Sequence, residues 1–581
     1  MEIDLIIKNA KIYNVFIKKW IHSDLCILKN KILFIGDSTK YNLTAKTNLD
    51  LKNKYIIPSF IDIHMHIESS LCTPKVFATE AIKHGLTTVV AEPHEVANVF
   101  GKEGISKMIE QSKNPFVDIF YGLPSSVPST SYKLENNGAE ITEKEIEELI
   151  KEHKEVICLG EVMQYRSLIN NFEDFALSHK KNKTVELIST VKESNHLFAI
   201  EGHCPSVTDL DLASVLYFGV NSDHCLQSPK SMKDRFKQGM FVQLQEKSIT
   251  KENMDVLKDG NYRELYSLVT DDCPPNIFVE KGHLDYVFRK AVSFGLSFED
   301  AIIATSYSPA KRMGFRDRGA LAPGYIADFL VIDKLDESFE INKVFKNGKE
   351  VIFTPLVDSY LENAKRKFPP YFYESIHINK DFDIKKALTV ESKNKDEIKA
   401  LVMRKNSKST YTEFIKKTFK IINNELDWQN QDINLVLSIN RYNKNTYGTG
   451  FMDGTAIKNG ALCSSHAHDS HNLLLLGDNK TDMEIAFNKI VEIQGGIVFV
   501  SKGQIINEIP LPVAGVISET NMKDLSNMII SIQNNLYDYG VKHPNPLMTL
   551  LTISLPVSPK IKISDKGLID VENQKIINLF C

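Results

Sequence analysis

The segment I-I-P-S-F-I-D-I-H-M-H-I-E-S-S, residues 56–70, sets the plan of the chain, because an apolar run ends in two histidines on alternate positions, His64 and His66. In an extended strand, residues two apart point to the same face, so both imidazoles would aim at one point. Converging imidazole nitrogens are what a divalent metal ion needs. The alternative is that one histidine lies in the core and the other is exposed. Further ligands elsewhere in the chain would favour the metal.

Bulk composition excludes several classes of protein. A chain of 581 residues suggests about two or three domains. Its 43% hydrophobic and 25% charged residues are typical of a soluble globular protein, and a net charge of −4 gives no electrostatic reason to expect nucleic acid or an anionic membrane as partner. No apolar run approaches the ~18 residues of a membrane span. The eight cysteines form no C-x-x-C pair, and the N-terminus lacks the plan of a signal peptide, so we expect a cytoplasmic protein with free thiols.

After residue 56, apolar strand-like runs alternate with amphipathic helical segments eight times. One helix is marked by a capping box at Thr142 and Glu145. The pattern predicts an α/β fold with a closed parallel (β/α)8 TIM-type barrel. An open doubly wound sheet is the rival, but it would usually carry a glycine-rich phosphate loop after its first strand, and none is present. The predicted strands are Ile56–His66, Leu86–Glu95, Phe116–Ser125, Val156–Tyr165, Leu197–Pro205, Val220–Cys225, Met240–Glu246 and Glu264–Asp272.

Two further units flank the predicted barrel, which we place at residues 56–319. Short strand-like segments in residues 1–55 and 320–355, the second with an Asn347-Gly348 turn, are expected to pair as one small β-domain. Residues 355–390 are predicted to form a connector that includes Pro369-Pro370. Residues 391–581 mix strand and helix patterns and are predicted to form an additional C-terminal α+β domain.

Polar residues recur at the C-terminal ends of the predicted barrel strands, where such barrels have their active sites. Taken singly, each has a structural explanation, such as a carboxylate neutralised by lysine or a hydrogen-bonded core histidine. Their recurrence at one end of several strands is better explained by a cation between them. Four histidines and two carboxylates suffice for two divalent metal ions bridged by a carboxylate. The polar residues at these strand ends include His64, His66, His94, Glu95, Glu161, His203, His224 and Asp271.

Five of these residues resemble the metal ligands of the amidohydrolase superfamily: His64, His66, His203, His224 and Asp271. The segment G-A-L-A-P-G-Y-I-A-D-F-L-V-I-D at 319–333 also resembles that superfamily. With Glu161, these five residues are the predicted metal ligands. More narrowly, the chain is similar to the bacterial adenine deaminase family. The matching stretches run from residue 60 to residue 472 and are F-I-D-I-H-M-H-I-E-S-S, P-H-E-V-A-N-V, G-E-V-M, G-H-C-P, S-D-H, T-D-D, E-K-G-H-L-D and S-S-H-A-H-D-S-H-N. Many amidohydrolases bridge their metals with a carbamylated lysine, whereas adenine deaminases use a glutamate, which Glu161 matches.

The resemblance implies metal-dependent hydrolysis of adenine to hypoxanthine and ammonia in purine salvage. It implies a dinuclear Mn²⁺ or Fe²⁺ centre, with Zn²⁺ as a further option, and a homodimer or larger homo-oligomer. Asp271 would accept a proton from the attacking water and pass it to the leaving amine, while Glu161 would bridge the metals and relay protons. Glu95 and His94 are candidates for stabilising negative charge that develops on the ring.

The sequence departs from the family pattern at Ser59, Glu92, Cys225 and Cys273, where the family usually has glycine, aspartate, glutamate and arginine. These departures leave the metal ligands intact but keep two other functions open. One is an amidohydrolase acting on another aminopurine, an N6-substituted adenine or a cyclic amide. The other is a weakly catalytic sensor of purine or metal, although such a binder would not need Asp271 in addition to Glu161.

A second histidine cluster lies in the C-terminal region, in the sequence H-A-H-D-S-H at residues 466–471. The spacing is compatible with another metal site, with His468 and His471 as ligands, or with a substrate lid. It is also compatible with a packing motif that has no chemistry. Because the motif matches the deaminase pattern, we expect this domain to abut the barrel mouth of its own chain or of a partner subunit.

Overall fold

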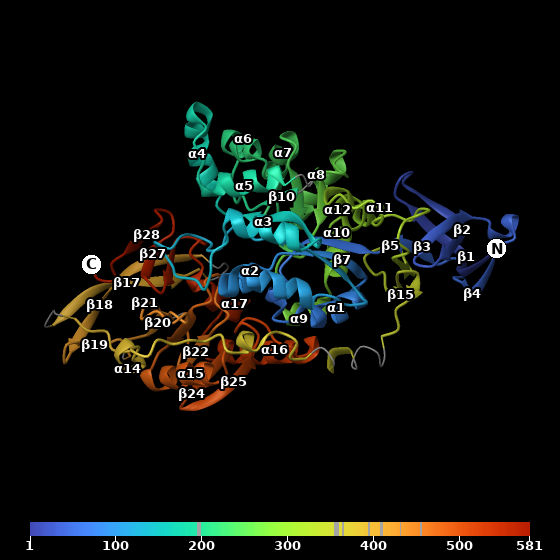
Figure 1. Cartoon of the computed structure of the whole chain (residues 1–581). Coiled ribbons are helices and arrows are strands. Elements are labelled where there is room, and N and C mark those ends of the chain that lie inside the picture. Colours follow the sequence, from blue (N-terminus) through green and yellow to red (C-terminus); the bar gives the residue numbers. More distant parts are fainter. Residues whose placement is uncertain are drawn as a thin grey trace.

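The computed structural model describes residues 1–194, 199–353, 360–362, 365–392, 396–406, 411–429, 431–453 and 456–581. Figure 1 shows three bodies of secondary structure. A β-sheet near the N-terminus lies at one end, a helix-covered parallel sheet occupies the centre, and the C-terminal region packs along one side of the centre.

The sheet near the N-terminus contains strands from both ends of the central region. Its order is β16-β15-β14-β5-β1-β2-β3, with β4 paired to β1. The β15–β16 hairpin turns at Asn347 and Gly348, whose φ angles of 53° and 76° are those that a two-residue type I′ turn requires. The strands are β1 (Glu2–Asn14), β2 (Lys19–Leu28), β3 (Lys31–Gly36), β4 (Thr44–Asp50), β5 (Tyr55–Pro58), β14 (Phe329–Ile332), β15 (Ile341–Lys346) and β16 (Lys349–Glu350).

The single strand predicted over residues 56–66 is wrong in one respect, because the structure divides it at Ser59. Residues 55–58 form β5, in which Pro58 lies opposite Phe329 of β14. The following residues form β6 (Phe60–Met65) of the central sheet. Pro58 has no N–H to donate, so a ladder that continues through it would lose a hydrogen bond. The chain passes from one sheet to the other at Ser59. There the Ser59 hydroxyl forms a hydrogen bond of 2.5 Å with the Thr87 hydroxyl.

The centre is a curled parallel sheet of the TIM-like type, and each of the eight predicted segments contains one of its strands. Residues 197 and 198 of the fifth segment lie outside the described residues. Five strands run in the order β10-β9-β8-β7-β6 and three in the order β11-β12-β13. The Asn221 N–H donates to the Ile200 carbonyl at 3.1 Å, and the Asp271 N–H donates to the His64 carbonyl at 3.0 Å. After β6 the strands are β7 (Leu86–Ala91), β8 (Asp118–Leu123), β9 (Val156–Val162), β10 (Ala199–Gly202), β11 (Ser222–Asp223), β12 (Phe241–Leu244) and β13 (Tyr266–Leu268).

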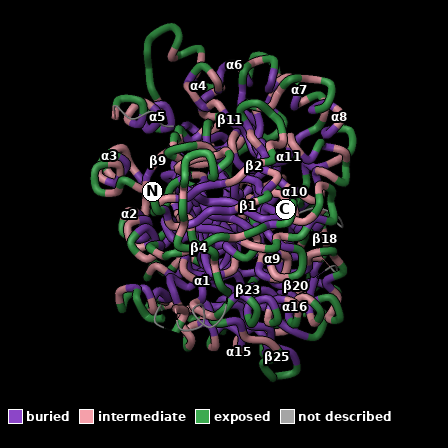
Figure 2. The backbone as a smooth tube through the Cα atoms, turned by 90° about the vertical axis from the view of Figure 1, so that its right-hand side faces the viewer, coloured by how far each residue is buried: buried purple, intermediate pink, exposed green. Residues whose placement is uncertain are grey.

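The backbone is buried in the middle of the molecule and exposed at its periphery (Figure 2). The predicted capping box opens α3, where the Thr142 N–H donates to Glu145 Oε2 at 2.8 Å. The helices are α1 (Pro74–Ala81), α2 (His94–Gln111), α3 (Glu143–Glu152), α4 (Tyr165–Ser178), α5 (Lys183–Glu193), α6 (Asp209–Phe218), α7 (Pro229–Lys237), α8 (Lys251–Asp259), α9 (Pro275–Lys281), α10 (Leu284–Ser293), α11 (Phe298–Thr305) and α12 (Tyr307–Arg312).

The C-terminal domain is built on a nine-stranded sheet with the order β19-β18-β17-β21-β20-β23-β22-β24-β25, together with a small sheet of β26-β27-β28. Its strands are β17 (Glu397–Lys405), β18 (Thr412–Ile422), β19 (Glu425–Leu426), β20 (Ile433–Ile439), β21 (Tyr447–Asp453), β22 (Ala461–Ser464), β23 (Leu473–Gly477), β24 (Gly496–Ser501), β25 (Gln504–Pro510), β26 (Ile561–Ser564), β27 (Gly567–Asp570) and β28 (Lys575–Ile577). Its helices are α14 (Ile384–Ala387), α15 (Lys480–Glu492), α16 (Met522–Asp538) and α17 (Pro546–Leu551).

The C-terminal domain is joined to the barrel by shared apolar packing. Helix α16 lies against α9 of the barrel. Phe77 of α1 and the α16 residues Leu525 and Ile529 belong to the same continuous cluster of buried side chains. A hydrophobic interface of this kind holds two domains in one relative position.

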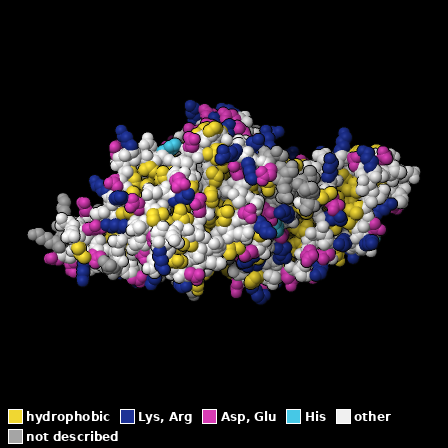
Figure 3. Space-filling model, turned by 90° about the horizontal axis from the view of Figure 1, so that it is seen from below, with side chains coloured by type: hydrophobic (Ala, Val, Ile, Leu, Met, Phe, Trp, Pro, Cys, Tyr) yellow, Lys and Arg dark blue, Asp and Glu magenta, His cyan; other side chains and the backbone are white. Residues whose placement is uncertain are grey.

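The surface shows no dominant charge on the face seen in Figure 3, where basic and acidic side chains alternate around small apolar patches. No helix in the described part of the chain combines the length and apolar character needed to cross a membrane.

Candidate metal centre

The structure brings the six predicted ligands together at the C-terminal ends of the barrel strands. His64 lies in β6, and Glu161 lies in β9. His203 and His224 directly follow β10 and β11, and Asp271 follows β13. His203 and Asp271 are partly exposed, and the other four are buried.

Glu161 lies at the centre of the group. Its Oε2 atom is 2.9 Å from His203 Nδ1 and 3.1 Å from His224 Nε2. Its Oε1 atom is 3.7 Å from His66 Nε2. One carboxylate therefore faces imidazoles from three different strands, which is the position that a bridging ligand requires.

Asp271 faces both histidines of the opening motif. Its Oδ1 atom is 3.7 Å from His64 Nε2 and 3.6 Å from His66 Nε2. The φ angle of Asp271 is 59°, in the left-handed region that costs a non-glycine residue free energy and that aspartate tolerates better than most. His64 and His66 are two residues apart in extended backbone, so their imidazoles point to the same side and both face the Asp271 carboxylate.

The surrounding charges keep these two carboxylates ionised. Burial alone would raise the pKa of Glu161, but the charges and hydrogen bonds of His224 and His203 lower it well below its ordinary value. Burial also opposes ionisation of Asp271, and the neighbouring His64 side chain and the charge of His224 lower its pKa. In contrast, burial and the charge of Glu161 raise the pKa of neighbouring Glu92 well above its ordinary value. The Glu161 N–H donates to Glu92 Oε2 at 2.7 Å.

The donor set fits a divalent metal ion. The buried His64 Nε2 and His94 Nδ1 atoms have no hydrogen-bond partner among the described residues. His64, His224 and Asp271 each offer one ligand atom, and these atoms lie within 4.8 Å of one another. The same holds for His66, His94 and Glu161. Imidazole and carboxylate donors suit manganese, iron and zinc, and a cation would supply the charge that buried carboxylates need.

Two further aspartates position this group, although neither was predicted as a site residue. Asp62 accepts hydrogen bonds from the Thr270 hydroxyl at 2.6 Å and from the Thr270 N–H at 3.1 Å, joining β6 to the segment that carries Asp271. Asp223 accepts from Arg235 Nε at 2.7 Å and from the Cys204 N–H at 2.9 Å. The only sequence signal was position, since each aspartate lies within two residues of a predicted histidine ligand.

His94 and Glu95 lie in the first turn of α2 rather than in a strand, so the predicted strand over residues 86–95 is too long. The strand β7 ends at Ala91, shortly before Pro93, which lacks the N–H that a ladder would use. His94 Nδ1 is 3.8 Å from Glu161 Oε1, and His94 Nε2 is 3.5 Å from Glu95 Oε1. His94 is therefore placed between the metal ligands and Glu95.

The C-terminal histidines meet the barrel of their own chain at Glu95. His468 Nδ1 is 2.6 Å from Glu95 Oε1, and His471 Nε2 is 2.5 Å from Glu95 Oε2. Both histidines lie on the loop between β22 and β23. His466 takes another role, since its Nδ1 is 3.2 Å from the Val516 carbonyl inside the C-terminal domain.

The four departures from the family pattern occupy different surroundings. Cys225 offers a sulfur within the 4.8 Å group that it forms with His203 and His224, so it borders the metal ligands. Cys273 is buried and is fixed through its backbone, with its N–H donating to the Ser69 hydroxyl at 3.2 Å. Ser59 joins the two sheets, and Glu92 contacts the Glu161 N–H, as described above.

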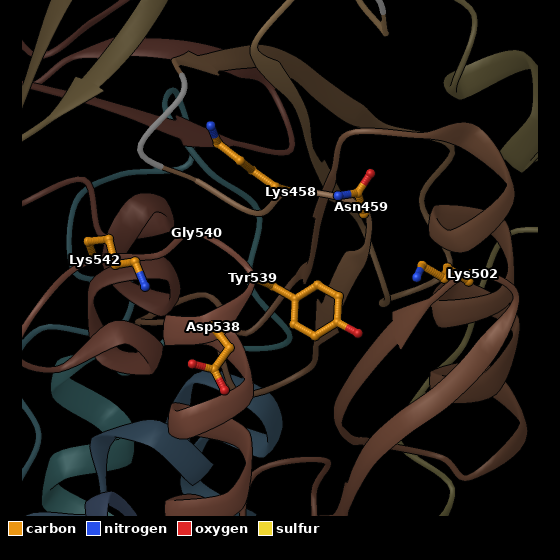
Figure 4. Close-up of a pocket in the computed structure, with 7 residues that line it drawn as sticks. All are labelled: Lys458, Asn459, Lys502, Asp538, Tyr539, Gly540 and Lys542. Atoms are coloured by element: carbon orange, nitrogen blue, oxygen red, sulfur yellow. The ribbon is translucent and has the colours of Figure 1, made fainter.

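A pocket of about 650 Å³ in the C-terminal domain shares no residue with these groups (Figure 4). Lys542 Nζ lies 3.8 Å from the centre of the Tyr537 ring, and Lys458 Nζ lies 3.4 Å from Asp432 Oδ1. Two of its ammonium groups therefore already have partners. The pocket is lined by Lys458, Asn459, Lys502, Asp538, Tyr539, Gly540 and Lys542.

A curled parallel sheet with histidines and carboxylates at its C-terminal ends is the arrangement of the amidohydrolases, and the family model described as "Amidohydrolase family" matches residues 55–351. A second model, "Adenine deaminase C-terminal domain", matches residues 409–575. An adenine deaminase of Clostridium perfringens strain 13 is 42% identical over 100% of this chain and 99% of its own length. "Adenine deaminase 2" of Shouchella clausii is 39% identical, again over 100% of this chain and 99% of its own. The chain belongs to the adenine deaminase family.

Among solved structures, an enamidase described as a member of the amidohydrolase superfamily covers 63% of this chain and 97% of its own, with 15% identity and a TM-score of 0.46.

Proposed function

We propose that the protein catalyses the hydrolytic deamination of adenine to hypoxanthine and ammonia, in purine salvage. The observation that carries this proposal is the position of Glu161, whose two oxygens face His203, His224 and His66. A glutamate in that place is what the adenine deaminase resemblance implies for the bridging ligand.

Two divalent cations, Mn²⁺ or Fe²⁺ with Zn²⁺ as the alternative, would be held at this centre. His64, His66 and Asp271 would hold one, and His203 and His224 the other, with Glu161 shared. When bound, they supply Lewis acidity that makes water a nucleophile near neutral pH. This assignment is supported by the donor types and by the orphaned His64 Nε2 atom.

The protein's own groups move the protons. Asp271 accepts a proton from the attacking water at its carboxylate and delivers it to the departing amino group, while the C6–N bond of adenine breaks. Glu161 relays protons within the centre. His94, with one nitrogen 3.8 Å from Glu161 Oε1, is placed to donate to the ring, and Glu95 orients His94 through its other nitrogen at 3.5 Å.

The architecture behind this function is proposed to be a complete (β/α)8 barrel at residues 56–319. The support is that hydrogen bonds continue across both ends of the five- and three-stranded sheets, from Asn221 to Ile200 and from Asp271 to His64. Residues 1–55 with 320–355 form the proposed β-domain, and 391–581 the C-terminal domain. The protein is proposed to act in the cytoplasm as a homodimer or larger homo-oligomer. Light scattering after gel filtration would measure the oligomeric state.

Ammonia release from adenine tests the activity. Protein loaded with Mn²⁺ should release ammonia and form hypoxanthine, and protein stripped with a chelator should not, until metal is restored. The Asp271→Asn variant serves as the control for contaminating activity. Absence of turnover by metal-loaded wild-type protein would contradict the proposal.

A second candidate substrate class is favoured by one observation, the Cys225 sulfur beside His203 and His224 where the family usually has glutamate. The second class comprises other aminopurines, N6-substituted adenines and cyclic amides. A panel of these compounds, ranked by kcat/KM against adenine, separates the two proposals. If no compound of the panel is turned over, a sensor of purine or metal remains the alternative.

A further inference from the structure

A second group of histidines and carboxylates lies where the barrel meets the C-terminal domain, and the proposed reaction uses only His94 and Glu95 of it. We define it as the junction cluster: His94, Glu95, His468, Asp469 and His471. We propose that the junction cluster binds a third divalent cation, separate from the catalytic pair.

The donor atoms already lie at the spacing of a metal site. His94, Glu95 and Asp469 each offer one ligand atom, and these three atoms lie within 4.8 Å of one another. His468 is a candidate for a fourth donor, because its Nδ1 is 2.6 Å from Glu95 Oε1 and 3.9 Å from Asp469 Oδ1. Two carboxylates and two imidazoles form a ligand set that suits Mn²⁺, Fe²⁺ or Zn²⁺.

An unpartnered atom gives independent support. Asp469 Oδ2 is buried and has no hydrogen-bond partner among the described residues. The residue is 4% exposed, so water from outside does not solvate it freely. A buried polar atom without a partner is costly, and a bound ion removes that cost for a carboxylate oxygen.

The carboxylates of the site have partners whose charge depends on protonation. In the described part of the chain, the ion pairs of Glu95 and Asp469 involve histidines alone. Carboxylates that are buried without lysine or arginine are commonly held by metal ions.

His94 separates the proposed site from the catalytic pair. Its Nδ1 is 3.8 Å from Glu161 Oε1, and its Nε2 is 3.5 Å from Glu95 Oε1. Each ring nitrogen therefore faces a different carboxylate, so a cation held at Nε2 would be a neighbour of the catalytic pair and not one of its members.

The third cation would join two domains. Glu95 and His94 come from α2 of the barrel, and His468 and Asp469 come from the β22–β23 loop. A cation held by all four would stabilise the folded protein only while both domains are in place, because binding to the native state alone raises its stability.

Metal stoichiometry tests the proposal. Protein saturated with Mn²⁺ and freed of excess by gel filtration should contain three ions per chain, measured by plasma mass spectrometry. Asp469→Asn, which keeps the shape of the side chain, should contain two. The control Asp538→Asn changes an exposed carboxylate of the same domain and should retain three.

An anomalous difference map from wild-type crystals soaked in Mn²⁺ should show a separate peak between His94 Nε2 and Asp469. This measurement needs no variant to fold. Two ions per wild-type chain, or the absence of that peak, would overturn the proposal, and three ions in Asp469→Asn would remove Asp469 as a ligand. Neither readout depends on deaminase activity, so a failure of the proposed reaction remains distinguishable from a failure of this site.

Discussion

Two buried glutamates in this protein each face a pair of histidines, but the histidines differ in their access to solvent. Glu161 lies 2.9 Å from His203 and 3.1 Å from His224, and Glu95 lies 2.6 Å from His468 and 2.5 Å from His471. The His203 side chain is 33% exposed, whereas that of His471 is 0% exposed. The first group is therefore in contact with solvent on one side, and the second is enclosed by protein. Solvent access, more than residue type, separates the candidate metal centre from the domain junction.

The strongest test of this contrast is Glu161→Gln. Loss of the bridging charge should remove bound metal and lower kcat/KM by roughly 10³-fold or more. Metal content and ammonia release, measured on the same preparation, check this. Glu95→Gln is the matched comparison, and a loss of the catalytic metals in that variant equal to the loss in Glu161→Gln would break the distinction between the two groups.

Within the first group, Asp271→Asn should separate proton transfer from metal binding. We expect kcat to fall by roughly 10²–10⁴-fold, because the amide cannot accept the proton. Metal content should stay near that of wild type, since Glu161 and the four histidines remain. Full turnover by this variant would show that another group transfers the proton.

The second group should matter more for stability. Glu95→Gln removes the carboxylate from between His468 and His471, so we expect the free energy of unfolding of the metal-free protein to fall by about 3 kcal/mol. Denaturant titration measures this, with the exposed Glu572→Gln as control. An unchanged denaturant midpoint in Glu95→Gln would mean that the stability of the domain junction does not depend on the Glu95 carboxylate.

A pH-dependent effect on stability, which is small within any one pH unit, is expected at Glu68. Burial raises its pKa to about 8, although the charge of His94 opposes the shift. The folded state then holds a proton that the unfolded state has lost, so stability falls as pH rises from about 4.5 to 8, by at most about 1.4 kcal/mol per pH unit.

Glu68→Gln should remove that dependence. The variant should be more stable than wild type near pH 8 and similar to it near pH 4.5, as measured by denaturant titration of metal-free protein. The exposed Glu147→Gln provides the control. An equal pH slope in wild type and Glu68→Gln would assign the dependence to other groups.

The elements that follow from local pattern were predictable from the sequence. The strand segments, the capping box at Thr142 and the turn at Asn347 each depend on residues close together in the chain. The convergence of His64 and His66 on Asp271 follows from strand alternation combined with the position of active sites in such barrels.

What the sequence could not provide were contacts between distant segments. The pairing of Glu95 with His471 joins residues of two domains, and no periodicity encodes it. Arg235 is buried against Asp223, which only the packing of neighbouring loops determines. The division at Ser59 depends on the partner strand β14, which lies far along the chain.

The pairing of β5 with β14 also has a consequence for biosynthesis. Residues 55–58 leave the ribosome early, but the strand that completes their sheet spans residues 329–332. Until then the nascent polypeptide carries an open β-edge that can associate with other chains. The N-terminal sheet can therefore be completed only after the whole barrel has been translated.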